Sequence, residues 1–333
     1  MNVLLTGGAG FIGSHAAAML AEAGHYVVIV DNLSNSDASV LRRLERVCGH
    51  PLPFVEGDIR DSALMRSTMK QHGVQSVMHF AGLKAVGESN EKPLDYYSNN
   101  VQGTISLLQA MDQCDVRQLV FSSSATVYGQ PQYLPLDEAH PTSATNPYGR
   151  TKLHIEEMLR DVAASSAQWR FVCLRYFNPV GAHSSGLLGE APRGTPNNLM
   201  PYVAQVAVGT RAHLNVWGDD YDTPDGTGVR DYIHVMDLVE GHLAALNFLQ
   251  DNAGWSAINL GTGTGYSVLD MVKAFEQASQ RAVPYSIKPR RQGDVASCYA
   301  NPQLALNKLG WRATRSLQDM CDSAWAWQSN VGK

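Results

Sequence analysis

The chain has 333 residues, of which 44% are hydrophobic and 17% charged, and this length suggests about two domains. A composition so close to the globular average excludes disordered, collagen-like and coiled-coil proteins. The net charge of −5, from 26 basic and 31 acidic residues, comes without a basic run and argues against nucleic acids or anionic membranes as partners.

Short apolar runs alternate with amphipathic stretches through the first half of the chain. Runs rich in Val, Ile, Leu and Phe that end at polar or Gly residues predict buried strands. These strands are expected at 3–6, 26–31, 53–55, 76–80, 118–122 and 171–176. Helices are expected between them, at 11–23, 37–48, 61–72, 93–114 and 147–167. This alternation predicts an α/β fold with a doubly wound parallel sheet of the Rossmann type.

The second half of the chain is less regular. Loops are expected at 178–197 and 218–229, helices at 197–209, 235–251 and 267–280, and strands at 213–217, 256–260 and 283–287. We therefore expect a first domain over 1–177 and a smaller mixed α/β lobe over 178–333. This lobe would pack on the carboxyl edge of the sheet, with part of its chain crossing back to the first domain.

A glycine-rich turn follows the first predicted strand. Gly7, Gly10 and Gly13 have the spacing G-x-x-G-x-x-G, which lets backbone approach a pyrophosphate at the N-terminus of the next helix. Asp31 lies 18 residues past Gly13, where a carboxylate binds the ribose hydroxyls of adenosine and repels a 2′-phosphate. This predicts NAD rather than NADP; the alternative is a structural turn beside an unrelated surface Asp. Residues 57–59 are either an adenine contact or an ordinary turn.

Tyr148 and Lys152 form a Y-x-x-x-K pattern after Asn146-Pro147, a helix N-terminal signal. Residues four apart share a helix face, so the Lys152 ammonium can stabilise a Tyr148 phenolate. Bringing a phenol pKa from about 10 to about 7 takes roughly 4 kcal/mol. Ser124 ends the fifth predicted strand, where its hydroxyl can bond the same substrate oxygen. The alternatives are a surface Tyr–Lys pair and a solvated serine turn.

Several other features bear on location and metals. No run approaches the ~18 apolar residues of a transmembrane helix, and the N-terminus lacks the basic and apolar regions of a signal peptide. The five cysteines form no C-x-x-C pair, which predicts a reducing cytoplasm rather than a disulfide framework or a zinc site. The acidic stretch 219–225 lacks EF-hand spacing and the histidines form no H-E-x-x-H, so no metal is expected.

Four segments resemble the extended short-chain dehydrogenase/reductase superfamily: TGGAGFIGSH at 6–15, HFAGLKAVGES at 79–89, SSSATVYG at 122–129 and YGRTK at 148–152. Within it, RYFNPVGAH at 175–183, PNNLMPYVAQVAVG at 196–209 and DGTGVRDYIHVMDL at 225–238 are similar to the UDP-glucose 4-epimerases. The resemblance implies a Rossmann domain with a small substrate lobe. It also implies inversion of C4 of a UDP-hexose through a 4-keto sugar, with bound NAD taking and returning the hydride.

The resemblance further implies a role for individual residues. Tyr148 would be the base, Lys152 would hold the nicotinamide ribose and lower the pKa of the tyrosine, and Ser124 would bond O4. The implied NAD-binding residues are Gly7, Gly10, Phe11, Ile12, Gly13, Asp31, Asn32, Asn35, Ser36, Asp58, Ile59, Phe80, Ala81, Lys84, Asn99, Ser122, Tyr148, Lys152 and Tyr176. The implied UDP-sugar-binding residues are Lys84, Ser124, Tyr148, Asn178, Asn198, Leu199, Asn215, Trp217, Arg230, Tyr232, Arg291, Asp294 and Cys298.

Two finer expectations concern substrate range and assembly. Cys298 falls where family members carry either a bulky Tyr or a small residue, and a small residue is associated with room for a 2-acetamido group. We therefore expect activity on UDP-N-acetylglucosamine as well; the alternatives are a small buried residue without this role, or a one-residue shift that brings in Tyr299. The helices at 93–114 and 147–167 resemble those that form a dimer interface in the superfamily, so a homodimer is expected.

Two other functions are open on the same fold. One is an NAD-dependent sugar-nucleotide 4,6-dehydratase, whose relatives typically place Asp-Glu after the strand-five Ser or Thr. This chain has Ala125-Thr126 there, and neither side chain can do acid/base work. The other is a non-catalytic NAD-sensing regulator, which usually loses the Tyr or the Lys, whereas Tyr148 and Lys152 are both present.

Overall fold

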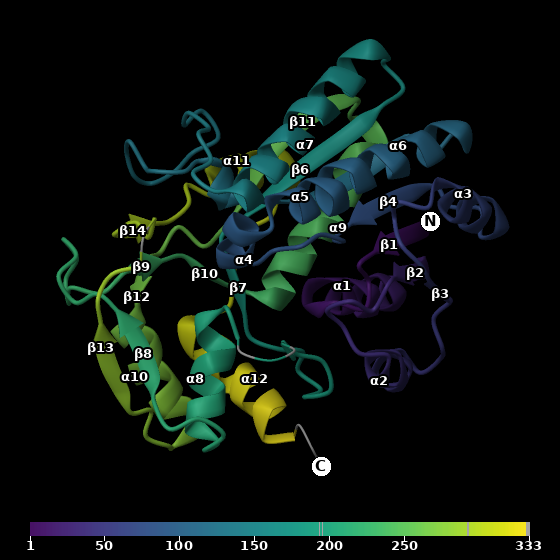
Figure 1. Cartoon of the computed structure of the whole chain (residues 1–333). Helices are drawn as coiled ribbons and strands as arrows, with labels where there is room; N and C mark the ends of the chain where they lie inside the picture. Colours follow the sequence, from purple (N-terminus) through teal and green to yellow (C-terminus); the bar gives the residue numbers. More distant parts are fainter. Residues whose placement is uncertain (193, 195, 292, 331–333) are drawn as a thin grey trace.

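One parallel sheet organises the molecule. The computed structural model describes residues 1–192, 194, 196–291 and 293–330, so 193 and 195 of the predicted loop 178–197 lie outside the described residues, as do 292 and 331–333 of the predicted second lobe. Seven parallel strands run in the order β11-β6-β5-β4-β1-β2-β3 (Figure 1). They are β1 (Asn2–Thr6), β2 (Tyr26–Asp31), β3 (Phe54–Glu56), β4 (Ser76–His79), β5 (Gln118–Ser124), β6 (Arg170–Tyr176) and β11 (Gly254–Leu260). The order reverses between β1 and β4, so the predicted doubly wound sheet is confirmed.

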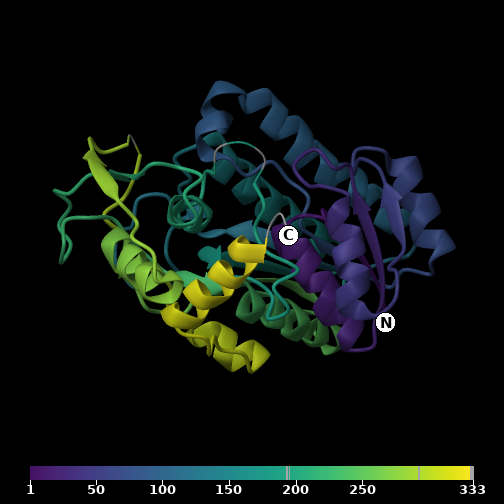
Figure 2. The same ribbon diagram turned by 90° about the horizontal axis from the view of Figure 1, so that it is seen from below.

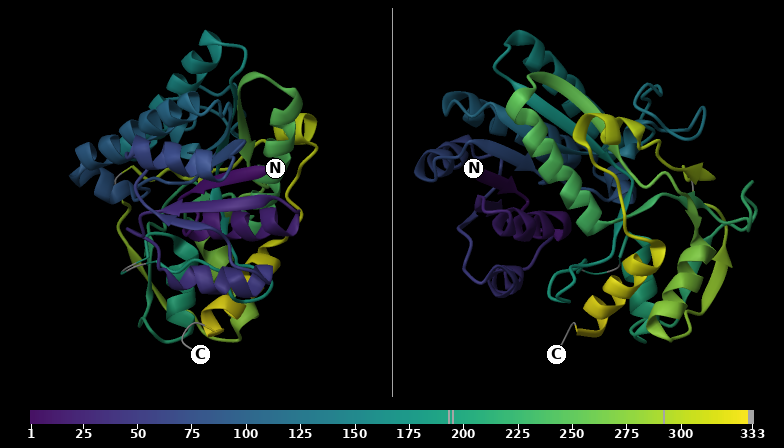
Figure 3. Two further views of the ribbon diagram at one scale, coloured as in Figure 1. Left: turned by 90° about the vertical axis from the view of Figure 1, so that its right-hand side faces the viewer. Right: turned by 180° about the vertical axis from the view of Figure 1, so that it is seen from behind.

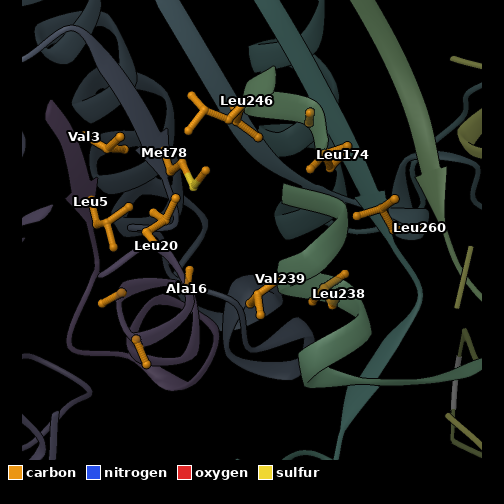
Figure 4. Packing of buried hydrophobic residues seen from close by; sticks show 14 of the residues in the cluster. Val3, Leu5, Ala16, Leu20, Met78, Leu174, Leu238, Val239, Leu246 and Leu260 are labelled. Carbon is orange, nitrogen blue, oxygen red and sulfur yellow. The ribbon is translucent and has the colours of Figure 1, made fainter. Parts of the chain in front are cut away.

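Helices cover both faces of this sheet (Figure 3). One face carries α1 (Phe11–Glu22), α2 (Ser39–Cys48), α9 (Val235–Asp251) and α11 (Gln303–Leu309), and the other carries α3 (Ser62–Gln71), α6 (Gly103–Gln113) and α7 (Pro147–Ser165). Alternate strand residues enter the two cores, with Val3 and Leu5 on the α1 side and Leu4 on the α7 side. Figure 4 shows side chains of β1, α1, β4, β6 and α9 meeting in the first core. Two buried faces explain why these strands are apolar throughout.

The helix predicted at 93–114 is interrupted. It consists of α5 (Pro93–Tyr96), a π-helical turn η1 (Tyr97–Gln102) and α6, preceded by the short α4 (Val86–Glu91). The π turn holds Asn100, which is buried and donates to Leu83 O and to Thr151 Oγ1, both at 3.0 Å. Its Oδ1 accepts from Leu83 N at 2.8 Å. The turn therefore fixes the loop after β4 against α7, which periodicity alone did not reveal.

A second lobe has its own apolar core, and its green and yellow segments lie to one side of the purple and blue ones in Figure 2. Its helices are α8 (Leu199–Ala207), α10 (Val268–Ser279) and α12 (Leu317–Asn330). Its short strands are β7 (Asn178–Val180), β8 (Leu214–Trp217), β9 (Val229–Arg230), β10 (Tyr232–His234), β12 (Tyr266–Ser267), β13 (Tyr285–Lys288) and β14 (Ser297–Cys298). They form three small sheets, β10-β7, β12-β9-β14 and β13-β8. Between these elements the chain crosses back, because α9 and β11 pack with the central sheet.

Within the described part of the chain, no helix is long and apolar enough to cross a membrane.

Candidate active site

The turn between β1 and α1 closes tightly on the loop after β4. Gly7 has φ +68°, and a Cβ added there would lie 2.6 Å from Ala81 N. A Cβ on Gly13 would lie 2.3 Å from the carbonyl oxygen of Gly7. Gly10 is the N-cap of α1 and has no side chain, so the first N–H groups of the helix stay available to an anion. This turn fits the pyrophosphate of a dinucleotide. It requires glycine at positions 7 and 13, where a Cβ would clash with backbone atoms.

Asp31 joins this turn to the loop that follows β2. Its buried carboxylate accepts from Ala9 N at 3.0 Å, Leu33 N at 2.8 Å and Ser36 Oγ at 3.0 Å. The next residue, Asn32, donates to Asp58 Oδ2 at 3.2 Å. The residues predicted for the adenosine end thus meet at the carboxyl ends of β2 and β3. Asn35 is exposed on the same loop, and Ile59, shortly after β3, is buried.

Asp58 carries a partner that sequence reasoning missed. Arg60 donates to it from Nε at 2.9 Å and from a terminal nitrogen at 2.8 Å, and these bonds lower the pKa of Asp58 to about 2. The guanidinium is therefore engaged by Asp58 rather than free to meet a 2′-phosphate, which fits the predicted preference for NAD.

Helix α7 presents the Tyr–Lys pair. Its N-cap, Asn146, accepts from Gly149 N at 2.9 Å, so the helix begins at the predicted residue. Lys152 is 4% exposed and donates from Nζ to Ser122 O at 2.6 Å. Burial lowers the pKa of Lys152 to about 8. The Lys152 ammonium also lies 4.7 Å from the centre of the Phe121 ring, so it is held in place and remains protonated at neutral pH.

Ser124 is oriented toward Tyr148. The serine hydroxyl accepts from Thr126 N at 3.2 Å and from Thr126 Oγ1 at 3.0 Å, which leaves its own proton to donate. Burial raises the pKa of the Tyr148 phenol, and the hydrogen bond with Ser124 lowers it. Burial dominates, so a phenolate here needs additional positive charge, which Lys152 and a cationic nicotinamide would provide. The residues present thus fit NAD at its reactive end as well as at its phosphates.

Aromatic side chains line the region between the glycine turn and β6. Phe80 and Tyr176 lie with ring centres 5.0 and 5.2 Å from His242, and the Tyr176 hydroxyl bonds His242 Nε2. His242 Nδ1 lies 2.8 Å from Leu238 O; since a carbonyl only accepts, Nδ1 carries the proton and Tyr176 donates to Nε2. Burial lowers the pKa of His242 to about 4, so this arrangement holds Tyr176 as a neutral phenol.

Lys84 and Asn198 were both predicted to bind the UDP-sugar, and they lie in different lobes. Both contact the carboxylate of Glu190. Glu190 Oε1 accepts from Asn198 Nδ2 at 2.7 Å and lies 3.2 Å from Lys84 Nζ. Its carbonyl oxygen accepts from Trp327 Nε1 at 3.2 Å. Glu190 was not predicted, and no spacing in the sequence singles it out.

The other predicted UDP-sugar residues fall into two clusters and a few separate positions. Arg230 on β9 is in register with Cys298 on β14, and burial raises the pKa of the Cys298 thiol to about 11. Arg291 bonds Asp294 at 3.0 Å and lies 5.7 Å from the centre of the Trp217 ring. Separate positions are Asn178 on β7, Leu199 at the start of α8, Asn215 on β8 and Tyr232 on β10. Asn99, which was predicted to bind NAD, lies in η1. Tyr232 is 3% exposed in the core of the second lobe, and its role stays a prediction, as do those of the others.

Similarity to known proteins extends over the whole chain. Residues 3–261 match the NAD dependent epimerase/dehydratase family. The chain is 58% identical to the UDP-glucose 4-epimerase of Bos taurus (98% of this chain, 96% of the relative) and 54% identical to that of Bacillus subtilis (99% and 97%).

Solved structures agree with these relatives. The UDP-glucose 4-epimerase of Stenotrophomonas maltophila, with bound NAD and formylated UDP-arabinopyranose, matches with a TM-score of 0.98 at 53% identity, covering 99% of this chain and 98% of that one. The enzyme of Bifidobacterium longum, in complex with NAD+ and UDP, matches with a TM-score of 0.96 at 53% identity and the same coverage. The resemblance noted in the sequence is thereby confirmed: the chain belongs to the NAD dependent epimerase/dehydratase family.

Proposed function

We propose that this chain catalyses the reversible C4 epimerisation of UDP-hexoses, with NAD as a tightly held cofactor. The observation that carries the proposal is the buried Lys152 ammonium, which is held by Ser122 O at 2.6 Å and lies one helical turn from Tyr148. Its position next to the turn at Gly7 supports a redox step at the same place. The similarity to UDP-glucose 4-epimerases over nearly the full length of both chains supports the choice of reaction.

The chain's own residues account for the proton transfers. Tyr148, ionised under the influence of Lys152, takes the proton of the 4-hydroxyl and later returns it. Ser124 donates to the same sugar oxygen, because its own oxygen is occupied by Thr126. Bound NAD supplies the acceptor and donor for the C4 hydride. In this proposal the 4-keto sugar presents its other face before C4 takes the hydride back, so the configuration at C4 inverts.

The two arginine clusters would hold the nucleotide end while the hexose turns. Arg230 and Arg291 offer planar, permanently charged forks that match diphosphate oxygens. The side chain of Arg291 is 55% exposed beside Asp294, so a ligand can reach it. Cys298 lies next to Arg230 in the sheet register, and its small side chain supports our proposal that UDP-N-acetylglucosamine is also accepted.

Assembly and location complete the proposal. We infer a homodimer formed through α5, α6 and α7, because Leu94 is 80% and Ile105 39% exposed there. Such side chains gain about 25 cal/mol for each Å² of apolar area buried. The division into a cofactor domain over 1–177 and a mainly substrate-binding lobe over 178–333 remains a proposal. A cytoplasmic location stays a prediction.

The test is NMR of purified protein with UDP-glucose, and then with UDP-N-acetylglucosamine, without added NAD. We expect both C4 epimers from each substrate. Tyr148→Phe should lower turnover by about 10²–10⁴-fold while NAD stays bound, whereas Tyr133→Phe, at an exposed tyrosine, should change nothing. No epimer from either substrate, with NAD present in the protein, would contradict the proposal and favour the dehydratase or the regulator.

A further inference from the structure

Three consecutive serines at 122–124 end strand β5, and each is tied to helix α7. The carbonyl oxygen of the first accepts from Lys152 Nζ at 2.6 Å. The hydroxyl of the second donates to Glu156 Oε1 at 2.5 Å, and the hydroxyl of the third lowers the pKa of the Tyr148 phenol. Tyr148, Lys152 and Glu156 are spaced four residues apart and therefore share one helix face. Glu156 thus extends the Tyr–Lys pattern by one turn, and none of the roles assigned above uses it.

Glu156 is a fully partnered buried carboxylate. It is 2% exposed and faces Arg175, which is 4% exposed on β6. Arg175 donates from Nε at 3.1 and 3.2 Å and from a terminal nitrogen at 2.6 Å. The other terminal nitrogen of Arg175 donates to Tyr128 Oη at 3.0 Å. Arg175 compensates the buried charge of this carboxylate, and removing either member of the pair would leave the other charge uncompensated.

The groups facing Lys152 differ in the charge they can carry. From α7 come Glu156 and, across one turn, Tyr148. From β6 comes the Cys173 thiol, which burial keeps neutral by raising its pKa well above the usual value. From β4 comes His79, whose pKa burial and the nearby Lys152 lower to about 3, so it is neutral. Burial lowers the pKa of Lys152, and of the two groups that raise it the Glu156 carboxylate acts more strongly than the Cys173 thiol.

We propose that Glu156 is a positioning residue of the epimerase reaction, which keeps Lys152 protonated and fixes the end of β5 so that the Ser124 hydroxyl faces Tyr148. The inference rests on the proposed function, because the ammonium matters only where Tyr148 must ionise. The direction of the expected pH effect follows from the charge of Lys152. Because Lys152 acts as a cation, activity is lost as pH rises through the pKa of Lys152. Removing the Glu156 charge lowers that pKa and moves this loss to lower pH.

The experiment compares pH profiles of kcat/KM for UDP-galactose in the NAD-loaded protein. Glu156→Gln should move the basic limb down by about one pH unit, the shift that one neighbouring opposite charge supplies. On the basic limb this corresponds to about tenfold less activity at a given pH, and the loss should shrink as pH falls. Glu157→Gln, at the exposed neighbour, removes the same charge from the surface and should leave the profile unchanged. Glu156→Asp keeps the negative charge, so its basic limb should lie close to that of the wild type.

The outcomes separate this inference from the proposed function. An inactive wild-type protein with NAD bound would refute the epimerase reaction itself. A second outcome is an active wild type and a Glu156→Gln variant whose activity is lower by the same factor at every pH. That result would show that Glu156 has a merely structural role, and it would overturn the inference. If Glu156→Gln does not fold, Glu156→Gln combined with Arg175→Met removes both buried charges. This double variant should still move the basic limb down, by less than Glu156→Gln alone because the loss of the Arg175 cation acts in the opposite direction, and an unshifted limb would overturn the inference.

Discussion

The Ser124 hydroxyl, which lowers the pKa of Tyr148, allows the effect of a Ser124→Ala substitution on kcat to be predicted in both direction and magnitude. Replacing Ser124 by Ala removes a hydroxyl that lowers the pKa of the base and, in the proposed reaction, donates to the sugar oxygen. A hydrogen bond to a charged group is worth about 1.5–3 kcal/mol, which corresponds to a roughly 10–150-fold fall in kcat. The fall should appear in kcat more than in KM, because the bond strengthens as charge develops on the oxygen.

The same substitution should change the pH dependence. The Ser124 bond lowers the pKa of Tyr148, so its loss raises that pKa. Because Tyr148 acts as a phenolate, activity rises with pH through its pKa, and the acid limb should move to higher pH. The assay is kcat/KM for UDP-galactose from pH 5 to 10, with bound NAD quantified in each preparation. Thr126→Val removes the Oγ1 donor to Ser124 but leaves the serine, and should have a smaller effect. A folded, NAD-loaded Ser124→Ala protein with unchanged kcat and an unmoved acid limb would refute this account.

Three further predictions concern the cofactor, the substrate and the assembly. Gly13→Ala places a Cβ 2.3 Å from the backbone oxygen of Gly7 and should abolish the retention of NAD through gel filtration. In the control variant Gly87→Ala the new Cβ meets nothing within 4 Å, so this protein should retain NAD fully. Cys298→Tyr should abolish turnover of UDP-N-acetylglucosamine and spare that of UDP-glucose in the NMR assay, and equal loss of both would argue against the role of this position. Leu94→Glu puts a charge on the proposed interface and should give monomers in light scattering, so an unchanged mass would place the interface elsewhere.

Local pattern was sufficient for the first six strands of the central sheet, whereas the place of β11 beside β6 was not predicted. The first six predicted strands and the helices between them all exist because each buries an apolar run or stripe against a face of the sheet. The start of α7 was predictable because Asn146 caps it. The strands β9, β12 and β14 have two residues each, too few for any periodicity, and they are fixed by pairing with one another.

The chemistry of the site was predictable only where it follows sequence spacing. Tyr148 and Lys152 are neighbours along one helix, so their proximity follows from the pattern alone. Glu190 meets Lys84 across a separation of 106 residues, and Arg175 meets Glu156 from another element. Such contacts depend on how elements pack, and no local property of Glu190 or Arg175 announces them. Glu156 was not predicted either, although the sequence places it four residues after Lys152 and so on the same helix face.

The late position of β11 has a consequence for how the chain is made. Gly254 to Leu260 of β11 pair with Arg170 to Tyr176 of β6. After β6 has been synthesised, about 80 further residues must therefore be added before its second neighbouring strand, β11, exists. At about 5–20 residues per second this takes roughly 4–16 s on the ribosome. For that time β6 is an open, apolar strand edge, the kind of surface that pairs with other chains. The nascent protein therefore passes through a stage vulnerable to aggregation that ends only when α9 and β11 have emerged and closed the sheet.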